Sequence, residues 1–553
     1  MSLLSSNPTI AAKIDELWNK FWSGGISNPL TAIEQITYLL FMKKLDENDL
    51  KAQADAEFTG RAFKSRFEGT YVPRTGRFDE WRQGEAMMSG QNLADEYGID
   101  KQLLRWGRFK RLPAEQMLDH IQRYVFPFLK ELDGNESPFA RHMANAVFII
   151  PKPSLLVEAV KTIDEIYELI EQDAAEKGQD FQDIQGDVYE MLLSEIASAG
   201  KNGQFRTPRH IIKLLVELVD PQPGHRIADP ACGTGGFLLG AYQYMITGTV
   251  PPKELKKVKP DEDGFVRSMR SPKLSQEVKD QLGEKLQGYD VDPTMVRMGL
   301  MNLMMHGIES PQIDYKDTLS KSYKEQAQYD VVLANPPFTG NIDKSDIHED
   351  LDLGTTKSEL LFIQRIYQLL RNGGTAGVIV PQGVLFGTGK AFVAARKLMV
   401  DKSELKAVVA LPSGVFKPYA GVSTALLIFT KGSETEQVWF YNMESDGYSL
   451  DDKRNKLKTA DGSDDYGDLQ EIVTLYQSRD PKKDSDRTAK HFFVPKQEVA
   501  EQEYDLSYAR YKEEVYEEIA YEAPDVILEK LIGEDGLEQQ IVKGLEELKG
   551  MIS

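Results

Sequence analysis

Several features that identify whole classes of protein are scarce or missing in this 553-residue chain. A single cysteine, Cys232, excludes an internal disulfide and is typical of proteins from a reducing compartment. No apolar run approaches the ~20 residues that a membrane-spanning helix needs. The first residues also lack the charged and apolar regions of a signal peptide. We therefore expect a cytoplasmic protein that does not enter a membrane. The seven histidines show no metal-ligand spacing, so no metal site is expected.

Positive charge is also in deficit, with 66 Lys and Arg against 87 Asp and Glu and a net charge of −21. Binding of duplex DNA depends largely on Lys and Arg that neutralise phosphates. The excess is uneven, because residues 497–553 hold five basic and 16 acidic residues, about half of the imbalance. We interpret this acidic tail as a solvated face or a docking element. If the chain acts on DNA, a more basic partner polypeptide is expected to help hold the duplex.

The helical and strand patterns divide the chain into three parts. Near the start, apolar residues such as Leu17 and Phe21 recur at helical spacing, and Asn28-Pro29 has the form of a helix cap with a first-turn proline. Further on, short apolar strands alternate with helices, which indicates a mostly parallel α/β sheet. The predicted parts are a helical domain that contacts DNA or a partner (1–170), an α/β domain (171–480) and an acidic helical tail (481–553).

Short apolar runs predict the strands of the α/β part, at residues 226–228, 286–289, 329–334, 375–380 and 405–411. Two later runs, 423–430 and 437–441, are joined by a polar turn and predict a hairpin that forms an antiparallel edge of the sheet. Two charged stretches, 248–283 and 450–490, are interpreted as insertions, and the second is expected to be mobile.

A glycine-rich turn follows the first predicted strand, with the sequence Asp229-Pro230-Ala231-Cys232-Gly233-Thr234-Gly235-Gly236. Glycines between a strand and a helix let a ligand approach the backbone, and the amino end of the helix favours negative charge. The turn lacks the Gly-Lys-Ser/Thr ending of a phosphate-binding loop. An ordinary tight connection is the alternative to a cofactor site. The candidate cofactor-binding residues are Asp229, Gly233, Thr234, Gly235 and Gly236.

Acidic residues end the next two predicted strands. Asp290 can accept hydrogen bonds from both hydroxyls of a ribose, as an acid at the end of a second strand commonly does. Asp292 precedes Pro293 and has the form of a helix cap. Asp317 ends the following strand and could bind an adenine amino group. The insertion 248–283 lengthens the gap between the glycine turn and these acids, so the choice between Asp290 and Asp292 for the ribose stays open.

The most specific pattern is Asn335-Pro336-Pro337-Phe338, directly after the strand 329–334. An aromatic exocyclic amine is a poor nucleophile because its lone pair is delocalised into the ring. The Asn335 side-chain oxygen and the Pro336 carbonyl can accept its two N–H bonds and draw the lone pair out of the ring plane. Pro337 stiffens the turn, and Phe338 offers a face on which a flipped base can stack. These four residues form the predicted catalytic group.

Together the motifs resemble those of the modification (methylation) subunit of type I restriction–modification systems, within the amino-methyltransferases. The segment Gly203-Gln204-Phe205-Arg206-Thr207-Pro208-Arg209 precedes the glycine turn, as in that family. It resembles the segment that closes over the methionine end of the cofactor. The match extends over nearly the whole chain, and it implies a Rossmann-like class I methyltransferase sheet between a helical front domain and a helical tail.

The resemblance also implies a cofactor, a reaction and partners. The cofactor is S-adenosyl-L-methionine, and the reaction is methylation of N6 of an adenine flipped out of duplex DNA. The partners are a specificity (S) subunit, docked on the tail, and a restriction (R) subunit, with two modification subunits per specificity subunit. Besides the glycine turn, Asp290 and Asp317, the residues that the resemblance assigns to the cofactor are Gln204, Phe205, Arg206, Thr207, Pro208 and Arg209.

Other functions share part of this pattern. A stand-alone adenine methyltransferase would need its own recognition domain, and neither insertion is large enough for one. A methyltransferase that acts on ribosomal RNA guanine or on a protein glutamine would share the Asn-Pro-Pro-aromatic motif. A non-catalytic assembly subunit would bind the cofactor only structurally. Cytosine-C5 methylation would need a nucleophilic cysteine beside the base, whereas Cys232 lies in the glycine turn.

A basic run with interleaved aromatic residues, Arg105-Trp106-Gly107-Arg108-Phe109-Lys110-Arg111, lies in the helical front domain. Such a run could contact nucleic acid. The alternative is a helical segment packed on its neighbours inside the domain.

Overall fold

The computed structural model describes residues 8–73, 98–132, 137–177, 207–268, 274–418, 421–514, 523–533 and 536–552. The chain forms two compact units, the first up to Tyr511 and the second from Lys512 onward. Across the described residues, each helix is too short or too polar to cross a lipid bilayer.

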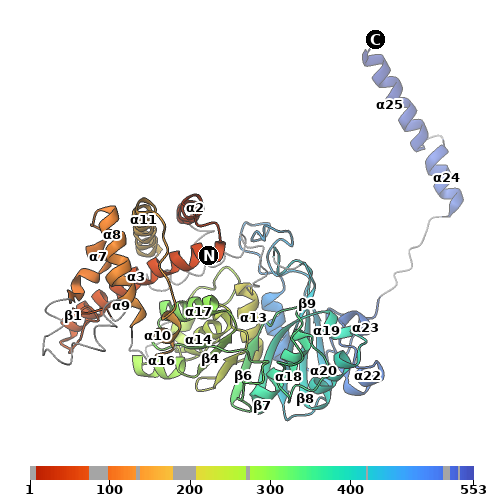
Figure 1. Cartoon of the computed structure of the whole chain (residues 1–553). Helices are drawn as coiled ribbons and strands as arrows, with labels where there is room; N and C mark the ends of the chain where they lie inside the picture. The colour runs from red at the N-terminus through yellow and green to blue at the C-terminus, as the bar shows by residue number, and fades with distance from the viewer. Residues whose placement is uncertain are drawn as a thin grey trace. The chain divides into compact units, whose positions relative to one another are not determined.

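Helices form the N-terminal part of the first unit, drawn in red to orange in Figure 1. The long ones are α2 (Pro8–Ser23), α3 (Pro29–Thr59) and α11 (Pro153–Lys177). The predicted cap is confirmed, since Asn28 Oδ1 accepts N–H bonds from Leu30 and Thr31 at 3.0 and 3.4 Å. The shorter elements are β1 (Thr70–Tyr71), β2 (Ile99–Asp100), η1 (Lys101–Leu104), α7 (Trp106–Phe109), α8 (Ala114–His120), η2 (Ile121–Val125), α9 (Phe126–Lys130) and α10 (Pro138–Met143).

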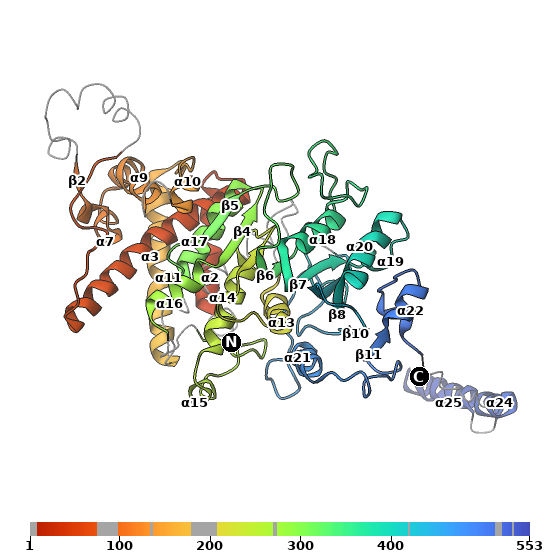
Figure 2. The ribbon, with the colours of Figure 1, turned by 90° about the horizontal axis from the view of Figure 1, so that it is seen from below.

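In the described part of the chain a nine-stranded sheet lies beside these helices, with the order β11-β10-β8-β9-β7-β6-β3-β4-β5 (Figure 2). Most neighbouring pairs are parallel, and β9 and β11 are the antiparallel strands. This arrangement confirms the predicted fold class. The strands are β3 (Ile227–Asp229), β4 (Leu286–Asp290), β5 (Gln312–Tyr315), β6 (Tyr329–Ala334), β7 (Leu370–Pro381), β8 (Ser403–Leu411), β9 (Thr424–Lys431), β10 (Gln437–Asn442) and β11 (His491–Pro495).

Both faces of the sheet are covered, because alternate residues of each strand point to opposite sides. Val331 and Leu333 of β6 belong to one apolar cluster, whereas Val332 and Ala334 belong to the other. The first face carries α13 (Arg209–Val219), α14 (Gly236–Gly248), α17 (Pro293–Met305) and α21 (Leu469–Ser478), and the second carries α18 (Ser358–Leu369) and α20 (Lys390–Asp401). The remaining short helices are α15 (Pro252–Leu255), α16 (Gln276–Gly283), α19 (Gly383–Phe386), α22 (Lys496–Glu501) and α23 (Tyr508–Tyr511).

The predicted hairpin is wrong in its pairing. β9 does not pair with β10 but lies between β7 and β8, antiparallel to both. β10 instead runs parallel to β8 and antiparallel to β11, so β10 and β11 form the antiparallel edge. The reason is that β9 is buried on both faces and is hydrogen-bonded along both edges, which leaves no free edge for its neighbour in sequence.

The second predicted insertion contributes to the core. Within residues 450–490, α21 buries Leu469 and Ile472 against the face that carries α13. The strand β11 follows, so residues beyond 480 still belong to the sheet. The separate second unit contains α24 (Pro524–Ile532) and α25 (Leu537–Ile552).

Candidate active site at the carboxyl edge of the sheet

The order of four parallel strands brings the predicted site residues to one edge of the sheet. β5, β4, β3 and β6 are consecutive neighbours, and all four run in the same direction. Asp317 follows β5, Asp290 ends β4, Asp229 ends β3 and Asn335 follows β6. Ligands of open α/β sheets bind beyond the carboxyl ends of the strands, which is where these four residues lie.

The glycine turn between β3 and α14 is held by its neighbours through backbone bonds. The Gly233 N–H donates to Asp290 Oδ2 at 2.9 Å, and the Cys232 N–H donates to the Tyr289 carbonyl at 2.9 Å. Gly235 caps α14 with a φ of 77°, a left-handed conformation that favours glycine. Among the residues that the structure describes, a Cβ at Gly233 would meet no atom within 4 Å, so a ligand can approach the backbone here.

The structure separates the roles of Asp290 and Asp292. Asp292 Oδ1 accepts the Thr294 N–H at 2.8 Å and caps α17, as predicted. Asp290 lies against the glycine turn, and its two oxygens each accept one backbone N–H, from Asp292 and Gly233. A carboxylate has about four lone-pair positions, so Asp290 can still accept bonds from ribose hydroxyls. Asp317 Oδ1 accepts the Leu319 N–H at 2.9 Å.

Asp229 is a buried acid, 1% exposed, and its burial disfavours the ionised form of the carboxyl. Burial raises its pKa to about 8, the Ala231 N–H works in the opposite direction, and the nearby Asp290 raises it further. Burial likewise raises the pKa of Asp290. Two adjacent buried acids of this kind favour a ligand that brings positive charge.

Replacing Asp229 with asparagine is expected to stabilise the protein at high pH. In the unfolded chain an aspartate ionises near pH 4, whereas in the folded protein this carboxyl keeps its proton up to about pH 8. Between these values the folded state binds more protons, so its stability falls as the pH rises. An asparagine side chain cannot ionise, and the variant should gain on the order of a few kcal/mol over the wild type above pH 8.

Melting temperatures of both proteins at pH 5 and pH 8.5 test this expectation. The melting temperature of Asp229→Asn should exceed that of the wild type by more at pH 8.5 than at pH 5. A difference that stays constant between the two pH values would show that Asp229 ionises normally in the folded protein.

Asn335 presents an unsatisfied acceptor at the end of β6. Its Nδ2 donates to Thr207 Oγ1 at 2.9 Å, while its Oδ1 is buried and makes no hydrogen bond with any described residue. A buried acceptor without a donor is costly, and such an atom is often kept because a ligand completes it. Pro336 is buried and Pro337 is exposed, so the turn leads from the sheet towards the surface.

Phe338 differs from the expected open stacking face. Its ring is 3% exposed and meets Phe416 edge to face, with the centroids 5.4 Å apart and the planes at 87°. Phe416 ends the segment Pro412-Ser413-Gly414-Val415-Phe416 after β8. A base could stack on Phe338 only after Phe416 or the Phe338 ring has moved.

Part of the predicted cofactor segment is described. Gln204, Phe205 and Arg206 lie outside the described residues. Thr207 is buried, and Pro208 and Arg209 begin α13. The segment therefore approaches the catalytic motif through the Thr207–Asn335 hydrogen bond.

The basic run of the front domain is partly internal. Arg105 is buried and forms ion pairs with Asp46 and Asp49 at 2.6 and 2.7 Å. Lys110 pairs with Asp164 at 2.7 Å. These two cations therefore support the packing alternative, because their charges are already neutralised within the domain.

The front domain is in direct contact with the helix that follows Asp290. Arg297 of α17 donates to Glu34 of α3 through Nε at 2.7 Å, and Tyr38 donates to the same carboxylate at 2.7 Å. His142 of α10 lies 3.2 Å from Asp314 of β5. These contacts fix the front domain against the cofactor side of the sheet.

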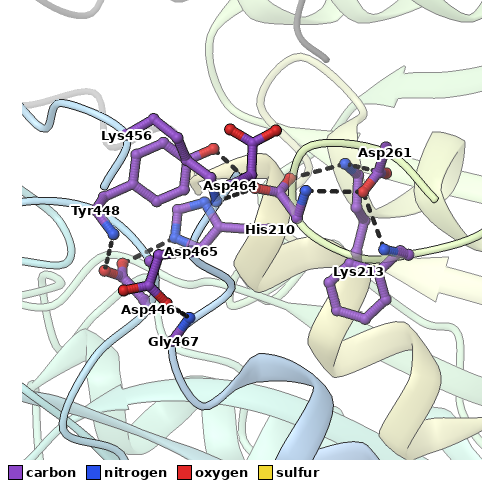
Figure 3. Close-up of polar contacts among 12 residues, drawn as sticks. His210, Lys213, Asp261, Asp446, Tyr448, Lys456, Asp464, Asp465 and Gly467 are labelled. Atoms are coloured by element: carbon purple, nitrogen blue, oxygen red, sulfur yellow. Dashed lines mark hydrogen bonds and ion pairs between the residues drawn. The ribbon is translucent and has the colours of Figure 1, made fainter. Parts of the chain in front are cut away.

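A buried polar cluster at the start of α13, drawn in Figure 3, was not among the sites that the sequence predicted. It joins His210 and Lys213 to residues of both stretches that were interpreted as insertions and to the loop after β10. No local signal could have identified it, because its members come from three segments that are distant in sequence.

Two family models match the chain. The model described as N-6 DNA Methylase matches residues 180–519, more than half of the chain. The model described as HsdM N-terminal domain matches residues 10–163, the helical front.

Curated relatives come from the same group. The Type I restriction enzyme EcoEI methylase subunit of Escherichia coli is 32% identical over 345 residues, which cover 60% of this chain and 63% of that protein. The Type I restriction enzyme StySPI methylase subunit of Salmonella potsdam is 28% identical over 464 residues, which cover 80% of this chain and 72% of that protein.

Solved structures share the fold. A chain from a structural study of complex assembly and conformational transition of the type I R-M system superposes with a TM-score of 0.62 at 24% identity, covering 98% of this chain and 99% of that chain. A type I restriction-modification system methyltransferase subunit from Streptococcus thermophilus gives 0.58 at 18% identity, covering 91% and 100%. With these family models and relatives, the chain belongs to the N-6 DNA methylase family, as a modification subunit of the type I restriction–modification group, and uses a methyl donor of the S-adenosylmethionine type.

Proposed function

We propose that this protein transfers a methyl group from S-adenosyl-L-methionine to N6 of an adenine flipped out of duplex DNA, as a site-specific adenine methyltransferase. The observation that carries the proposal is the buried, unpartnered Oδ1 of Asn335. It lies at the same edge of the sheet as the glycine turn and Asp290. Methylation of an amine requires a hydrogen-bond acceptor of this kind beside the cofactor site.

The residues at the edge fit this cofactor. The open space over Gly233 would admit the methionine part close to the backbone, and Asp290 would accept the ribose hydroxyls. The buried carboxyl of Asp229, whose pKa burial raises, would be stabilised as an anion by a positively charged ligand. Asp317 would bind the adenine. When bound, S-adenosyl-L-methionine supplies an electrophilic methyl group on a sulfonium.

The chain's own residues orient the target amine. Asn335 Oδ1 and the Pro336 carbonyl accept its two N–H bonds, which draws the nitrogen lone pair out of conjugation with the ring. No base is required before attack, and positioning supplies most of the rate enhancement. Phe338 stacks on the base once Phe416 has moved away from its ring. Extrusion of the base from the duplex costs a few kcal/mol, which binding of the DNA must supply.

The proposed partners are inferred from the C-terminal second unit and from the net negative charge of the chain. The separate second unit carries exposed apolar side chains on both of its helices, and we assign it to a specificity subunit that reads the DNA sequence. That subunit would supply the positive charge that this chain, at −21, lacks. Two modification subunits per specificity subunit, and a restriction subunit, complete the proposed complex, which would act in the cytosol.

Labelled cofactor tests the function directly. The chain co-purified with its specificity subunit is incubated with [methyl-³H]-S-adenosylmethionine and, in turn, duplex DNA, ribosomal RNA or protein extract. Label is expected in DNA only, as N6-methyladenine, and sequencing of modified bases should place it at a split, two-part motif. Label in RNA guanine or in protein glutamine would contradict the proposal. Efficient site-specific methylation by the isolated chain would contradict the role of the specificity subunit.

A further inference from the structure

We infer that Thr207 is a positioning residue that anchors the Asn335 carboxamide, an inference that rests on the proposed function. Asn335 Nδ2 donates to Thr207 Oγ1 at 2.9 Å. A carboxamide has one accepting and one donating end, whereas a hydroxyl can serve as either partner. The bond therefore holds the carboxamide in place, and in the orientation that the structure has, the oxygen end remains for the target amine. The reversed orientation would bring the NH₂ group against the N–H bonds of the amine, where neither group can accept.

This role differs from the one implied by the family resemblance, which assigns Thr207 to the cofactor. The hydrogen bond joins residues 128 positions apart in the sequence. It links the segment before α13 directly to the catalytic motif after β6.

The position of Thr207 is fixed because contacts of His210 and Lys213 hold the start of α13, and these two sets of contacts are called clamps. His210 is 5% exposed, and its Nε2 lies 2.8 Å from Asp446 Oδ2. Its ring stacks on Tyr448, with the centroids 4.5 Å apart and the planes at 20° (Figure 3). Arg454 also pairs with Asp446. The loop after β10 therefore holds the start of the helix from one side.

Lys213, about one turn later and on the same side of α13, adds a second set of contacts. Its Nζ pairs with Asp261 at 2.6 Å and with Asp263 at 2.9 Å. Asp263 also accepts the Tyr448 hydroxyl at 2.7 Å, which joins the two clamps into one network. The charged neighbours outweigh burial, so the pKa of Lys213 is raised and that of Asp263 is lowered. Both groups are therefore charged, and the start of α13 cannot shift without breaking buried ion pairs.

The clamp residues themselves are poor probes, because removal of one partner of a buried ion pair is strongly destabilising. The Thr207 hydroxyl can be removed with much less disturbance. Thr207→Val keeps the shape and loses the hydroxyl, whereas Thr207→Ser keeps the hydroxyl. Thr375→Val is the matched control, since it breaks a comparable bond, 2.9 Å to Thr430, within the sheet.

The test uses the full chain assembled with its specificity subunit and target DNA. For Thr207→Val we expect kcat to fall about 10- to 30-fold, the effect of one lost hydrogen bond, with the cofactor Kd changed less than about twofold. Thr207→Ser should recover kcat to within about threefold of the wild type, and Thr375→Val should match the wild type. A Thr207→Val effect confined to the cofactor Kd, an unchanged kcat, or failure of serine to rescue would overturn the inference.

A second readout needs no turnover and so separates this inference from the proposed function. With selective ¹⁵N-asparagine labelling, the Asn335 side-chain amide signal is identified by its loss in Asn335→Ala. We expect slow exchange of these amide protons in the wild type and Thr207→Ser, and fast exchange in Thr207→Val. Equal exchange in all three would overturn the positioning role. A wild type without DNA methylation would instead count against the proposed function.

Discussion

Replacing Asn335 with alanine is expected to lower kcat for DNA methylation by about 10²–10³-fold, the usual cost of removing one preorganised polar group from an active site. The Pro336 carbonyl would remain as the only acceptor from the motif for the two N–H bonds of the amine. The cofactor Kd should change less than about threefold, because Asp229, Asp290 and the glycine turn are untouched. Single-turnover kinetics and equilibrium binding of the cofactor measure the two effects separately.

The melting temperature of Asn335→Ala provides a second test. The Oδ1 of Asn335 is buried without a donor, so alanine removes an unsatisfied polar atom together with the bond to Thr207. These effects oppose each other, and the melting temperature should not fall by more than about 2 °C. Asn372→Ala, at an exposed position in the first part of β7, is the matched control and should keep full activity. Methylation that survived Asn335→Ala would contradict the mechanism.

The largest effect on assembly is expected in the second unit. The apolar stripe of α25 includes Ile541 and Leu545, which are 55% and 61% exposed. The double variant Ile541→Asp/Leu545→Asp should no longer co-purify with the specificity subunit, because a docked stripe would bury two unpaired charges. Site-specific methylation should then be lost, whereas the melting temperature and cofactor affinity of the chain itself should stay unchanged.

The control for this variant lies on the opposite side of the same helix. Gln539→Asp also adds a negative charge to α25, but away from the stripe, so the complex should form normally. Size-exclusion chromatography with light scattering measures the assembly in each case. A double variant that still forms the complex would place the docking surface outside the α25 stripe.

Much of the fold and part of the site could be predicted because their signals are local. The strands β3 and β6 are short apolar runs, each followed at once by a chemically specific turn, Asp229 to Gly236 and Asn335 to Phe338. In a parallel sheet such turns converge at one edge whatever the loop lengths. The cap role of Asp292 was predictable for the same reason, since it depends only on the next two residues.

The errors concern pairing and packing. A short polar turn between two apolar runs usually indicates a hairpin, yet β9 is inserted between β7 and β8. Phe338 was expected to offer a face for a stacked base, and the sequence could not show that its ring is buried and meets Phe416 edge to face. The stretch 450–490 was interpreted as a charged insertion, yet it buries Leu469 and Ile472 in the core, and its Arg454 pairs with Asp446.

The sequence by itself therefore determined the family, the class of sheet and the residues that carry the proposed chemistry, because strand ends, turns and caps are encoded within a few neighbouring positions. Only the tertiary structure decided which strand lies beside which, why Asn335 keeps a free acceptor, and how His210 and Lys213 hold the start of α13. Those features depend on contacts between segments more than 40 residues apart, and a contact over such a distance is selected by burial and charge pairing in the whole fold rather than by any local pattern.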